Sequence, residues 1–314
     1  MNALNRIKTR PTKSILISGA SGLIGGALCP ALTQRGHIVR TLSRSHGDQL
    51  WHINDQTLKK GALDEIDCVI HLAGENIAQR WTPRARERIL RSRTESTQLL
   101  TANILKQSRP IDFISASGIN FYGETKTERP TTEASPAGTG FLATVCQAWE
   151  RAAQPLQRAA LRTVFIRTGV VLSAQGGALA KMLPPFRLGL GGRIGSGKQY
   201  MSWISLSDIV QIYIRAVEDQ SLGGPINATA PQAISNLEFT KTLGRVLKRR
   251  TFCPLPAVMI RVLFGAMGRE TILSNLNVAP DRLLHAGFEW LYPELEPLLQ
   301  YELCAAKQGR FRSR

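Results

Sequence analysis

The feature that most constrains this chain is an apolar run at residues 14–18 that breaks into a glycine-rich turn and continues as an amphipathic stretch at residues 23–35. This order predicts a β-strand, a tight turn and an α-helix. The glycines are spaced three residues apart, at Gly19, Gly22 and Gly25. Gly19 can adopt a positive φ, Gly22 lets a pyrophosphate approach the main chain, and Gly25 lets the helix pack on the strand.

A helix that begins directly after such a turn directs its unpaired N–H groups and the positive end of its dipole toward the turn. The alternative is a purely structural glycine turn. The position between a strand pattern and a helix pattern favours a ligand, because the dinucleotide fingerprint requires that context. We therefore predict that a dinucleotide binds here.

Beyond the turn, strand patterns and helix patterns alternate. This alternation predicts the α/β class, with a doubly wound parallel sheet (Rossmann) covered by helices on both faces. Further strands are predicted at residues 38–43, 68–73, 112–117 and 164–172, and helices at 83–106 and 139–160, the latter interrupted near Pro155.

The pattern changes after Leu172. A helix from residue 177 is expected to stop at Pro184-Pro185, and five glycines within residues 189–197 predict a loop. Helices are predicted at residues 206–217, 236–247, 256–267 and 292–299. The predicted organisation is a basic disordered leader at 1–13, a nucleotide-binding Rossmann domain at 14–220 with a substrate-side loop at 184–205, a small helical region at 221–300 and a basic tail at 301–314.

The chain is strongly basic, with 40 Lys and Arg against 23 Asp and Glu and a formal net charge of +17. Such a surface attracts phosphate-bearing ligands and, nonspecifically, nucleic acid. Aromatic residues make up only 6% and do not interleave with the charge, so no specific nucleic-acid partner is predicted. No apolar window approaches a membrane span, and we predict no membrane partner. Five scattered cysteines without CxxC spacing predict no metal and a reducing cytoplasm.

The end of the second predicted strand indicates which dinucleotide binds. Sites that prefer NADH place an acidic residue there for the ribose 2′-hydroxyl, whereas an arginine suits a 2′-phosphate. This chain has Ser43 and Arg44 at that point and no acid. A guanidinium binds phosphate through two hydrogen bonds, and a serine hydroxyl adds another. The sequence therefore predicts NADP, with NADPH preferred over NADH.

The chain resembles the extended short-chain dehydrogenase/reductase superfamily of NAD-dependent epimerases and dehydratases. More narrowly, it resembles the "epimerase family protein" branch, which adds a small C-terminal helical region. The strings that carry the resemblance are the glycine turn from Gly19 to Gly25, His71-Leu72-Ala73-Gly74-Glu75-Asn76, Ser115-Ala116-Ser117 with Tyr122-Gly123, Arg167 to Leu172, and Phe186 to Gly192 followed by Ile194 to Gly197.

The resemblance implies that NADP(H) binds at the carboxyl ends of the sheet strands. It assigns cofactor contacts to the glycine turn, to the residues that follow the second and third predicted strands, to one arginine of the helix at 83–106 and to one residue of the strand at 164–172. These residues are Gly19, Ser21, Gly22, Leu23, Ile24, Gly25, Ser43, Arg44, Leu72, Ala73, Gly74, Arg93 and Val171. Arg93 also has a physical rationale, because an arginine that faces the cleft can pair with a phosphate.

The catalytic pattern of the superfamily is incomplete. Its members usually carry Tyr-x-x-x-Lys, in which the Tyr exchanges a proton with the substrate oxygen. The helix expected to hold this pair begins at Phe141 and contains neither residue. Ser117 keeps the serine position and is expected to bond a substrate carbonyl. Three sources of the proton stay open, namely Tyr122, Cys146 and water.

Further residues are assigned by their context. The glycine-rich loop, with Arg193, Lys198 and Trp203, is expected to border the substrate cleft, because two cations suit an anionic ligand. His71 lies on an apolar strand and is predicted to be a core residue. Glu150 is assigned to packing and capping.

The sequence predicts an NADP(H)-dependent oxidoreductase or epimerase-like enzyme that acts on an unknown small-molecule substrate as a monomer or homodimer. Since the usual proton donor is absent, a second hypothesis of a different class stands beside it. The chain would then bind NADP(H) without turnover and act as a redox sensor or regulatory protein.

Overall fold

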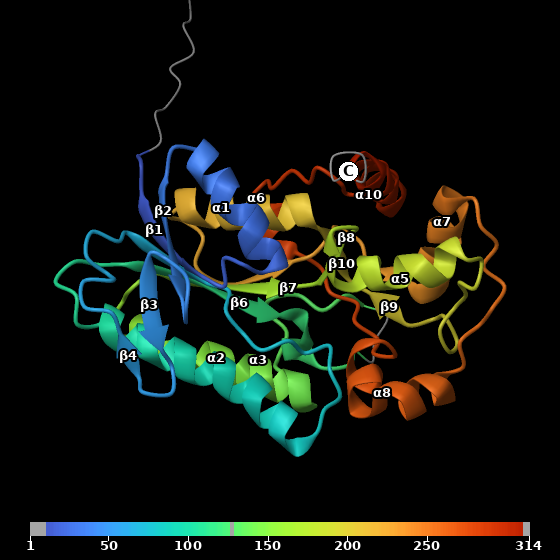
Figure 1. Ribbon diagram of the computed structural model, residues 1–314, viewed down its shortest axis with the longest axis horizontal. Coiled ribbons are helices and arrows are strands. Elements are labelled where there is room, and N and C mark those ends of the chain that lie inside the picture. The colour runs from blue at the N-terminus through green and yellow to red at the C-terminus, as the bar shows by residue number, and fades with distance from the viewer. Residues whose placement is uncertain (1–10, 126–128, 310–314) are drawn as a thin grey trace, which may run out of the picture.

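An eight-stranded sheet forms the centre of the molecule in the computed structural model, which describes residues 11–125 and 129–309 (Figure 1). Its strands are β1 (Ser14–Ser18), β2 (Ile38–Ser43), β3 (Gln49–His52), β4 (Thr57–Leu58), β5 (Cys68–His71), β6 (Asp112–Gly118), β7 (Thr163–Thr168) and β11 (Gly224–Ala228). They lie in the order β11-β7-β6-β5-β1-β2-β3-β4, and every pairing is parallel except that of β3 with β4. The predicted doubly wound parallel sheet is confirmed.

Helices cover both faces of this sheet. In Figure 1, α1 (Leu23–Gln34) and α6 (Leu206–Glu218) lie above the sheet, and α2 (Pro83–Ile104) and α3 (Phe141–Ala152) lie below it. The side chains of β1 alternate between the two cores, because successive strand residues point to opposite faces. Ile15 and Ile17 pack with α1 and α6, whereas Leu16 packs with α2. Burial on both faces explains the unbroken apolar run in this strand.

Several elements differ from the predicted ones. The strand expected at residues 164–172 is divided at Gly169 into β7 and β8 (Val170–Ser173). A Cβ at Gly169 would lie 2.8 Å from the carbonyl oxygen of Ser202, so the backbones approach closely there. The strand β11 was not predicted, and it extends the sheet beyond residue 220, where we expected the nucleotide-binding domain to end.

The remaining elements lie outside the sheet and these four helices, several of them at the right of Figure 1. They are η1 (Ile119–Tyr122), α4 (Gln154–Arg158), α5 (Gly177–Arg187), β9 (Tyr200–Met201), β10 (Trp203–Ser205), β12 (Ile234–Ser235), α7 (Asn236–Leu247), α8 (Ala257–Thr271), α9 (Asp281–His285) and α10 (Leu295–Gly309). The predicted end of α5 at Pro184-Pro185 is wrong. Both prolines accept N–H groups of the next turn, from Leu188 and Leu190, and the helix continues to bury Phe186.

Both predicted terminal segments extend beyond what the structure describes. Residues 1–10 and 310–314 lie outside the described residues. At the other end of the predicted leader, Lys13 is held in the fold, where its Nζ lies 3.1 Å from Asp112 and 2.9 Å from the carbonyl oxygen of Val217. Where we predicted the tail to begin, α10 continues to Gly309 and buries Leu303. No described helix is both long and apolar enough to cross a bilayer.

Side chains connect the C-terminal region to the sheet domain. The buried carboxylate of Asp208, in the first turn of α6, accepts the backbone N–H groups of Leu291 and Tyr292 at 2.6 and 3.2 Å. Trp290 donates its indole N–H to the carbonyl oxygen of Thr229, and Glu302 on α10 accepts the N–H of Ala174. These contacts fix α10 against the end of β8.

Candidate functional site

The turn after β1 has the backbone geometry that its glycine spacing predicts. Gly19 has a φ of +76°, and a Cβ there would lie 2.8 Å from the backbone nitrogen of Ala73. A Cβ on Gly25 would overlap the carbonyl oxygen of Gly19, closer than real Cβ atoms lie. Only glycine fits at these two positions, one because of its φ and both because of the close packing.

Gly22 differs from the other two glycines because protein packing constrains it less. A Cβ there would approach only the carbonyl oxygen of Gly19, at 3.3 Å, and the residue is exposed. Gly22 is the N-cap of α1; no side chain caps this helix, and no acidic residue lies in its first turn. The first-turn N–H groups, which have no partner within a helix, are therefore available to an anion.

Strand register brings the other predicted cofactor residues to the same edge. Ser18 of β1 pairs with Leu42 on one side and with His71 on the other, so the residues that follow these three strands are neighbours. Ser43 and Leu72 thus flank the turn. Residues 176–177 also lie close to the turn, because Cβ atoms at Gly176 and Gly177 would lie 3.3 Å from the side chain of Leu23. The adjacent strand β8 carries Val171.

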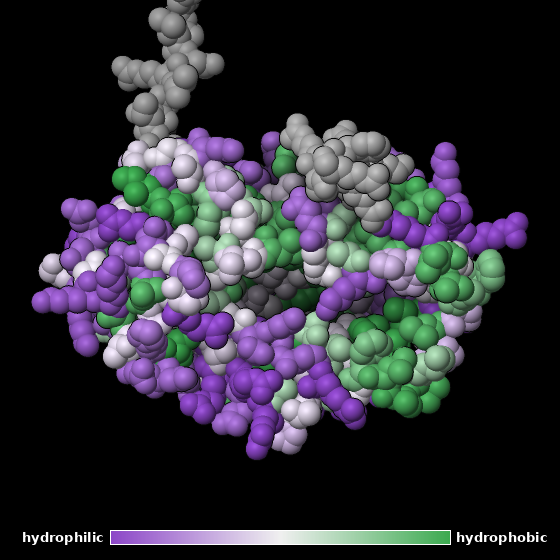
Figure 2. Space-filling model, viewed as in Figure 1, coloured by the Kyte–Doolittle hydropathy of each residue, from purple (hydrophilic) through white to green (hydrophobic). Residues whose placement is uncertain are grey.

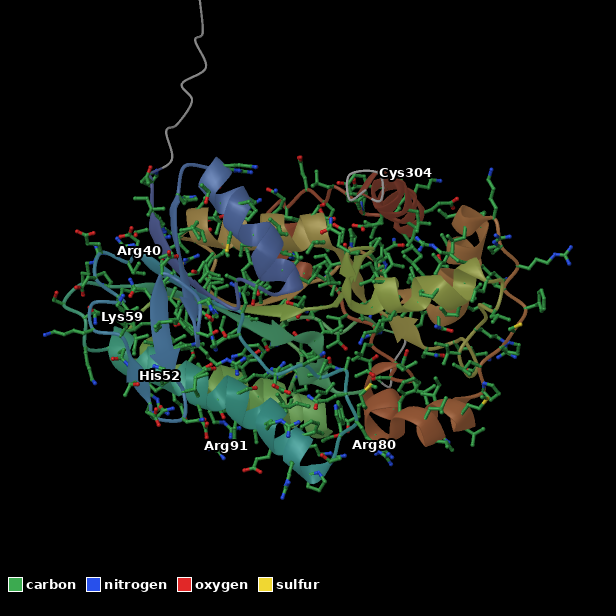
Figure 3. The ribbon with its side chains drawn as sticks, viewed as in Figure 1. Arg40, His52, Lys59, Arg80, Arg91 and Cys304 are labelled. Carbon is green, nitrogen blue, oxygen red and sulfur yellow. The ribbon has the colours of Figure 1, made fainter. Side chains whose placement is uncertain are left out.

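Arg44 lies beside a hollow of about 640 Å³ that also contacts β3 and α2. His52 and Arg91 line this hollow, and both are labelled in Figure 3. Arg91 is neutralised by two glutamates of its own helix, at 3.3 and 2.6 Å, whereas Arg44 has no hydrogen-bond or ion-pair partner among residues 11–125 and 129–309. Ser43 accepts the N–H groups of the two residues that follow Arg44, both at 3.4 Å, and keeps its hydroxyl proton to donate.

Arg93 projects from α2 onto the loop after β5. Its Cζ would lie 3.0 Å from a Cβ at Gly74, and it lies 5.0 Å from the ring centroid of Trp149. Burial lowers the pKa of Arg93. Its hydrogen bond to the carbonyl oxygen of Ile89 is 3.0 Å long, and within the described part of the chain no carboxylate forms an ion pair with it. A partly buried guanidinium without a paired acid can bind a ligand anion.

Ser117 and Tyr122, the two predicted catalytic residues, belong to one buried hydrogen-bond network. The Ser117 hydroxyl donates to Glu150 Oε1 at 2.8 Å. Arg167 forms two hydrogen bonds of 2.8 Å with the same carboxylate and donates a third, also 2.8 Å, to the Tyr122 hydroxyl. The Tyr122 hydroxyl in turn donates to Asn227 Oδ1 at 2.8 Å.

This network determines what the candidate proton donors can do. Burial raises the pKa of Tyr122, and its hydroxyl proton is already directed at Asn227. Burial also raises the pKa of the Cys146 thiol to about 11, with a further contribution from the charge of Glu150. Burial alone would lower the pKa of Arg167, but its hydrogen bonds and charge interaction with Glu150 raise it. Both candidate donors therefore hold their protons at neutral pH.

Glu150 and Arg167 are the site residues that the sequence analysis missed. Glu150 was assigned to packing and capping, yet its carboxylate binds both Arg167 and Ser117. The signal that identifies them is the arginine within the apolar strand β7, because a charge in a strand buried on both faces requires an opposite charge nearby.

Two other sequence assignments have clear outcomes. His71 is a core residue, as predicted: it is fully buried, its ring nitrogens hydrogen-bond with Ser18 and Ser96, and burial lowers its pKa to about 3. Trp203 does not border a cleft, contrary to prediction, because its strand β10 is inserted beside β8 and only 1% of the residue is exposed. Across residues 11–125 and 129–309, no cluster of His, Cys, Asp or Glu side chains has metal-site geometry.

A second hollow of about 500 Å³ lies beside the glycine-rich loop. Lys198 lines it, together with Glu124, Tyr200 and Arg261. Arg193 instead donates to the carbonyl oxygen of Gly195. The two cations singled out in this loop thus face different surroundings.

Family models and sequence relatives agree on what this chain is similar to. Residues 15–228 match the NAD dependent epimerase/dehydratase family, and residues 255–302 match a domain of unknown function, DUF1731. The epimerase family protein Mb2239 of Mycobacterium bovis is 40% identical over 292 residues, which cover 91% of this chain and 96% of that protein. The epimerase family protein SDR39U1 of Homo sapiens is 38% identical over 291 residues, which cover 91% and 98%.

Solved structures give the same picture. The crystal structure of human SDR39U1 (isoform 2) with NADPH superposes with a TM-score of 0.84 at 36% identity, covering 92% of this chain and 98% of that one. The UDP-glucose 4-epimerase of Thermus thermophilus, in complex with NAD, gives a TM-score of 0.71 at 16% identity and covers 91% and 96%. The second likeness shows the fold alone.

Proposed function

The chain belongs to the NAD-dependent epimerase/dehydratase family, and from this premise we propose that it is an NADPH-dependent oxidoreductase or epimerase-like enzyme that acts on a small molecule. The observation that carries the proposal is the N-terminus of α1, which no side chain caps and which lies at a turn where Gly19 and Gly25 are sterically required and Gly22 is exposed. Such a turn is built for the pyrophosphate of a dinucleotide.

The residues present fit NADPH. The turn from Gly19 to Gly25 would hold the pyrophosphate, and Ser43 and the unpaired Arg44 would hold the 2′-phosphate. Human SDR39U1, at 36% identity, was crystallised with NADPH, which supports this choice of cofactor. When bound, NADPH supplies the hydride, while the protein supplies orientation and charge.

Ser117 is the residue we propose for contact with the substrate oxygen. It lies one residue before the end of β6, next to the strand that leads to Ala73, and thus lies at the same sheet edge as the turn. Its hydroxyl is oriented by Glu150, which the bidentate contact with Arg167 holds in place. Because this hydroxyl has a single proton and donates it to Glu150, it must rotate away from Glu150 to donate to a substrate carbonyl.

Arg44→Ala tests the cofactor assignment. We expect NADPH binding to weaken by about tenfold or more, because a hydrogen bond between charged groups is lost, while NADH binding is unchanged. The measurement is a fluorescence titration with each nucleotide. Arg40→Ala, four residues earlier on β2 and paired with Glu65, is the matched control and should bind NADPH like the parent. Equal NADPH affinity in Arg44→Ala and parent would contradict the assignment.

Ser117→Ala tests the catalytic role in a screen of carbonyl substrates with NADPH. For any substrate that the parent reduces, we expect kcat to fall by about 10²-fold, as for other residues that act on a transferred proton, with NADPH affinity unchanged. Ser115→Ala is the control, since Ser115 is buried on the same strand and its hydroxyl bonds a backbone carbonyl. Full turnover by Ser117→Ala would remove this residue from the mechanism.

One observation favours the second hypothesis, a non-catalytic NADP(H) sensor. The Tyr122 and Cys146 protons are both held by burial, and Tyr122 is also bound to Asn227. A sensor would change its structure with the redox state of the nucleotide, so limited proteolysis of the C-terminal region should differ between NADPH and NADP⁺. Identical digestion patterns with NADPH, NADP⁺ and no nucleotide would count against it.

A further inference from the structure

The first half of α8 exposes an unusual number of apolar side chains. Val258, Val262 and Leu263 are 62%, 78% and 63% exposed, and Met259 and Phe264 are 46% and 38% exposed. In Figure 2 these residues contribute to the apolar area at the lower right, over α8. Large contiguous apolar patches on a protein surface mark interaction sites.

The local structure explains why this half of α8 protrudes. Gly265 interrupts the helix with a φ of +57°. Beyond it, Met267 packs into the cluster around Trp81, and Glu270 accepts the N–H of Leu142 at the start of α3. Before it, Ile260 is the buried residue of the turn. The second half of α8 is thus anchored, while the first half projects from the molecule.

A neighbouring loop enlarges the exposed area. Residues 191–195 run beside residues 253–255, joined by backbone hydrogen bonds such as that from Leu255 to Arg193. The flanks of these segments carry Leu188, Leu190 and Phe252, which are also exposed. We call these three residues, together with Val258, Met259, Val262, Leu263 and Phe264, the apolar face.

Positive charge predominates around the apolar face. Residues 186–200 contain three cations and residues 248–269 contain five, and neither segment contains an acidic residue. The cations are Arg187, Arg193, Lys198, Lys248, Arg249, Arg250, Arg261 and Arg269. Two acids lie nearby: Glu124 lines the hollow that Lys198 and Arg261 share, and Glu270 is bound to α3. A partner that binds this face must therefore present an apolar region surrounded by negative charge.

We propose that the apolar face docks on the surface of a lipid bilayer that contains anionic headgroups. Apolar side chains of a protruding helix enter the boundary between headgroups and acyl chains, and the surrounding lysines and arginines contact the headgroups. The sequence predicted no membrane partner because no segment is long enough to span one, but docking at the surface requires no spanning segment.

Charge and shape both favour a bilayer over a second copy of this chain. Two copies placed face to face would bring eight cations of one against eight of the other, which is repulsive. The protruding turn exposes apolar residues on most of its circumference, so a rigid partner would need a deep groove to cover it. A fluid bilayer surrounds such a helix without one.

The test is co-sedimentation of the full chain with two sets of vesicles, one of phosphatidylcholine alone and one with about a third of phosphatidylglycerol. A protein of charge +17 binds anionic vesicles weakly by charge alone, so the decisive variant removes apolar contact. We expect Val262→Gln with Leu263→Gln to lower the affinity for anionic vesicles about tenfold or more. Ile38→Gln, an exposed apolar residue on β2, is the matched control and should bind like the parent.

A second variant tests the charge component. Arg249→Gln with Arg250→Gln should weaken anionic-vesicle binding about thirtyfold, since each cation near such a surface contributes on the order of 1 kcal/mol. Arg84→Gln with Arg158→Gln, which removes the same charge elsewhere, should weaken it much less. Vesicle binding that is the same for the Val262/Leu263 double variant and the parent would overturn the proposal. So would a parent dimer that this variant converts to monomer, since the face would then be an interface between copies.

Discussion

Arg167 is the single residue on which most of the candidate site depends. It lies in β7, between apolar residues buried on both faces of the sheet, and is itself 4% exposed. Its guanidinium binds Glu150 twice and Tyr122 once, and it stacks 3.5 Å from the ring centroid of Phe121. Through these contacts one side chain fixes both Ser117, by way of Glu150, and the 3₁₀ turn that carries Tyr122.

Arg167→Met tests this dependence. The substitution leaves Glu150 buried without a counterion, and we expect the free energy of unfolding to fall by about 3–5 kcal/mol. Arg167→Met combined with Glu150→Leu removes both charges and should recover most of the loss, because a hydrophobic pair of similar volume replaces the ion pair. Urea denaturation at neutral pH measures both. A double variant that is less stable than Arg167→Met would contradict this account.

At the scale of elements, the packing of α1 on β1 decides the shape of the cofactor turn. A methyl group on Gly25 would overlap the backbone of Gly19 and Ala20, whereas one on Gly26 would meet only the carbonyl oxygen of Ala20, at 3.8 Å. Two adjacent glycines of one helix are therefore under different constraints.

Gly25→Ala and Gly26→Ala make a matched pair. We expect Gly25→Ala to lower the free energy of unfolding by about 1–3 kcal/mol, because the helix must move away from the strand, and to weaken NADPH binding. Gly26→Ala should raise stability by up to about 1 kcal/mol, because alanine favours the helix more than glycine does. Thermal unfolding with and without NADPH measures both effects. Equal behaviour of the two variants would show that the packing at Gly25 is not restrictive.

Elements with strong local signals were predictable from the sequence. The strand β1 and the helix α7 were predicted at their observed positions because their apolar spacing is local. The strand β11 was missed because it begins with Gly224-Pro225 and is a strand by virtue of pairing with β7. The cofactor turn is likewise local. The contacts of Glu150 with Ser117 and Arg167 span 33 and 17 residues and depend on the folded sheet.

At the scale of the whole molecule, Asp208 joins the two regions. It lies three residues after the N-cap Ser205 of α6, and Glu238 lies three residues after the N-cap Ser235 of α7. Only Asp208 is buried, and its carboxylate accepts two N–H groups from the segment that leads to α10. The two helices therefore share one capping arrangement, but only in α6 does the acidic residue also bind a segment that is distant in the sequence.

Asp208→Asn should destabilise the protein by about 2–3 kcal/mol, since hydrogen bonds to a buried carboxylate are replaced by weaker ones and the new amide N–H₂ faces a donor. Proteolysis between α9 and α10 should accelerate with it. Glu238→Gln, the equivalent change on the exposed cap, should stay within about 0.5 kcal/mol of the parent. Urea denaturation and timed chymotrypsin digestion, which can cleave after Phe288 and Trp290 in this segment, provide the two readouts, and similar losses in both variants would contradict the joining role.

The amino edge of the sheet has a consequence for dividing this chain into fragments. Lys13 contacts Asp112 and the carbonyl oxygen of Val217, while Arg162 contacts Asp112 and the carbonyl oxygens of Ala216 and Asp219. These two cations bind carbonyl groups in the last turn of α6 and at its C-cap residue, Asp219. An expressed fragment that starts at the first strand, Ser14, would discard one of them. A fragment boundary should therefore be placed ahead of Lys13.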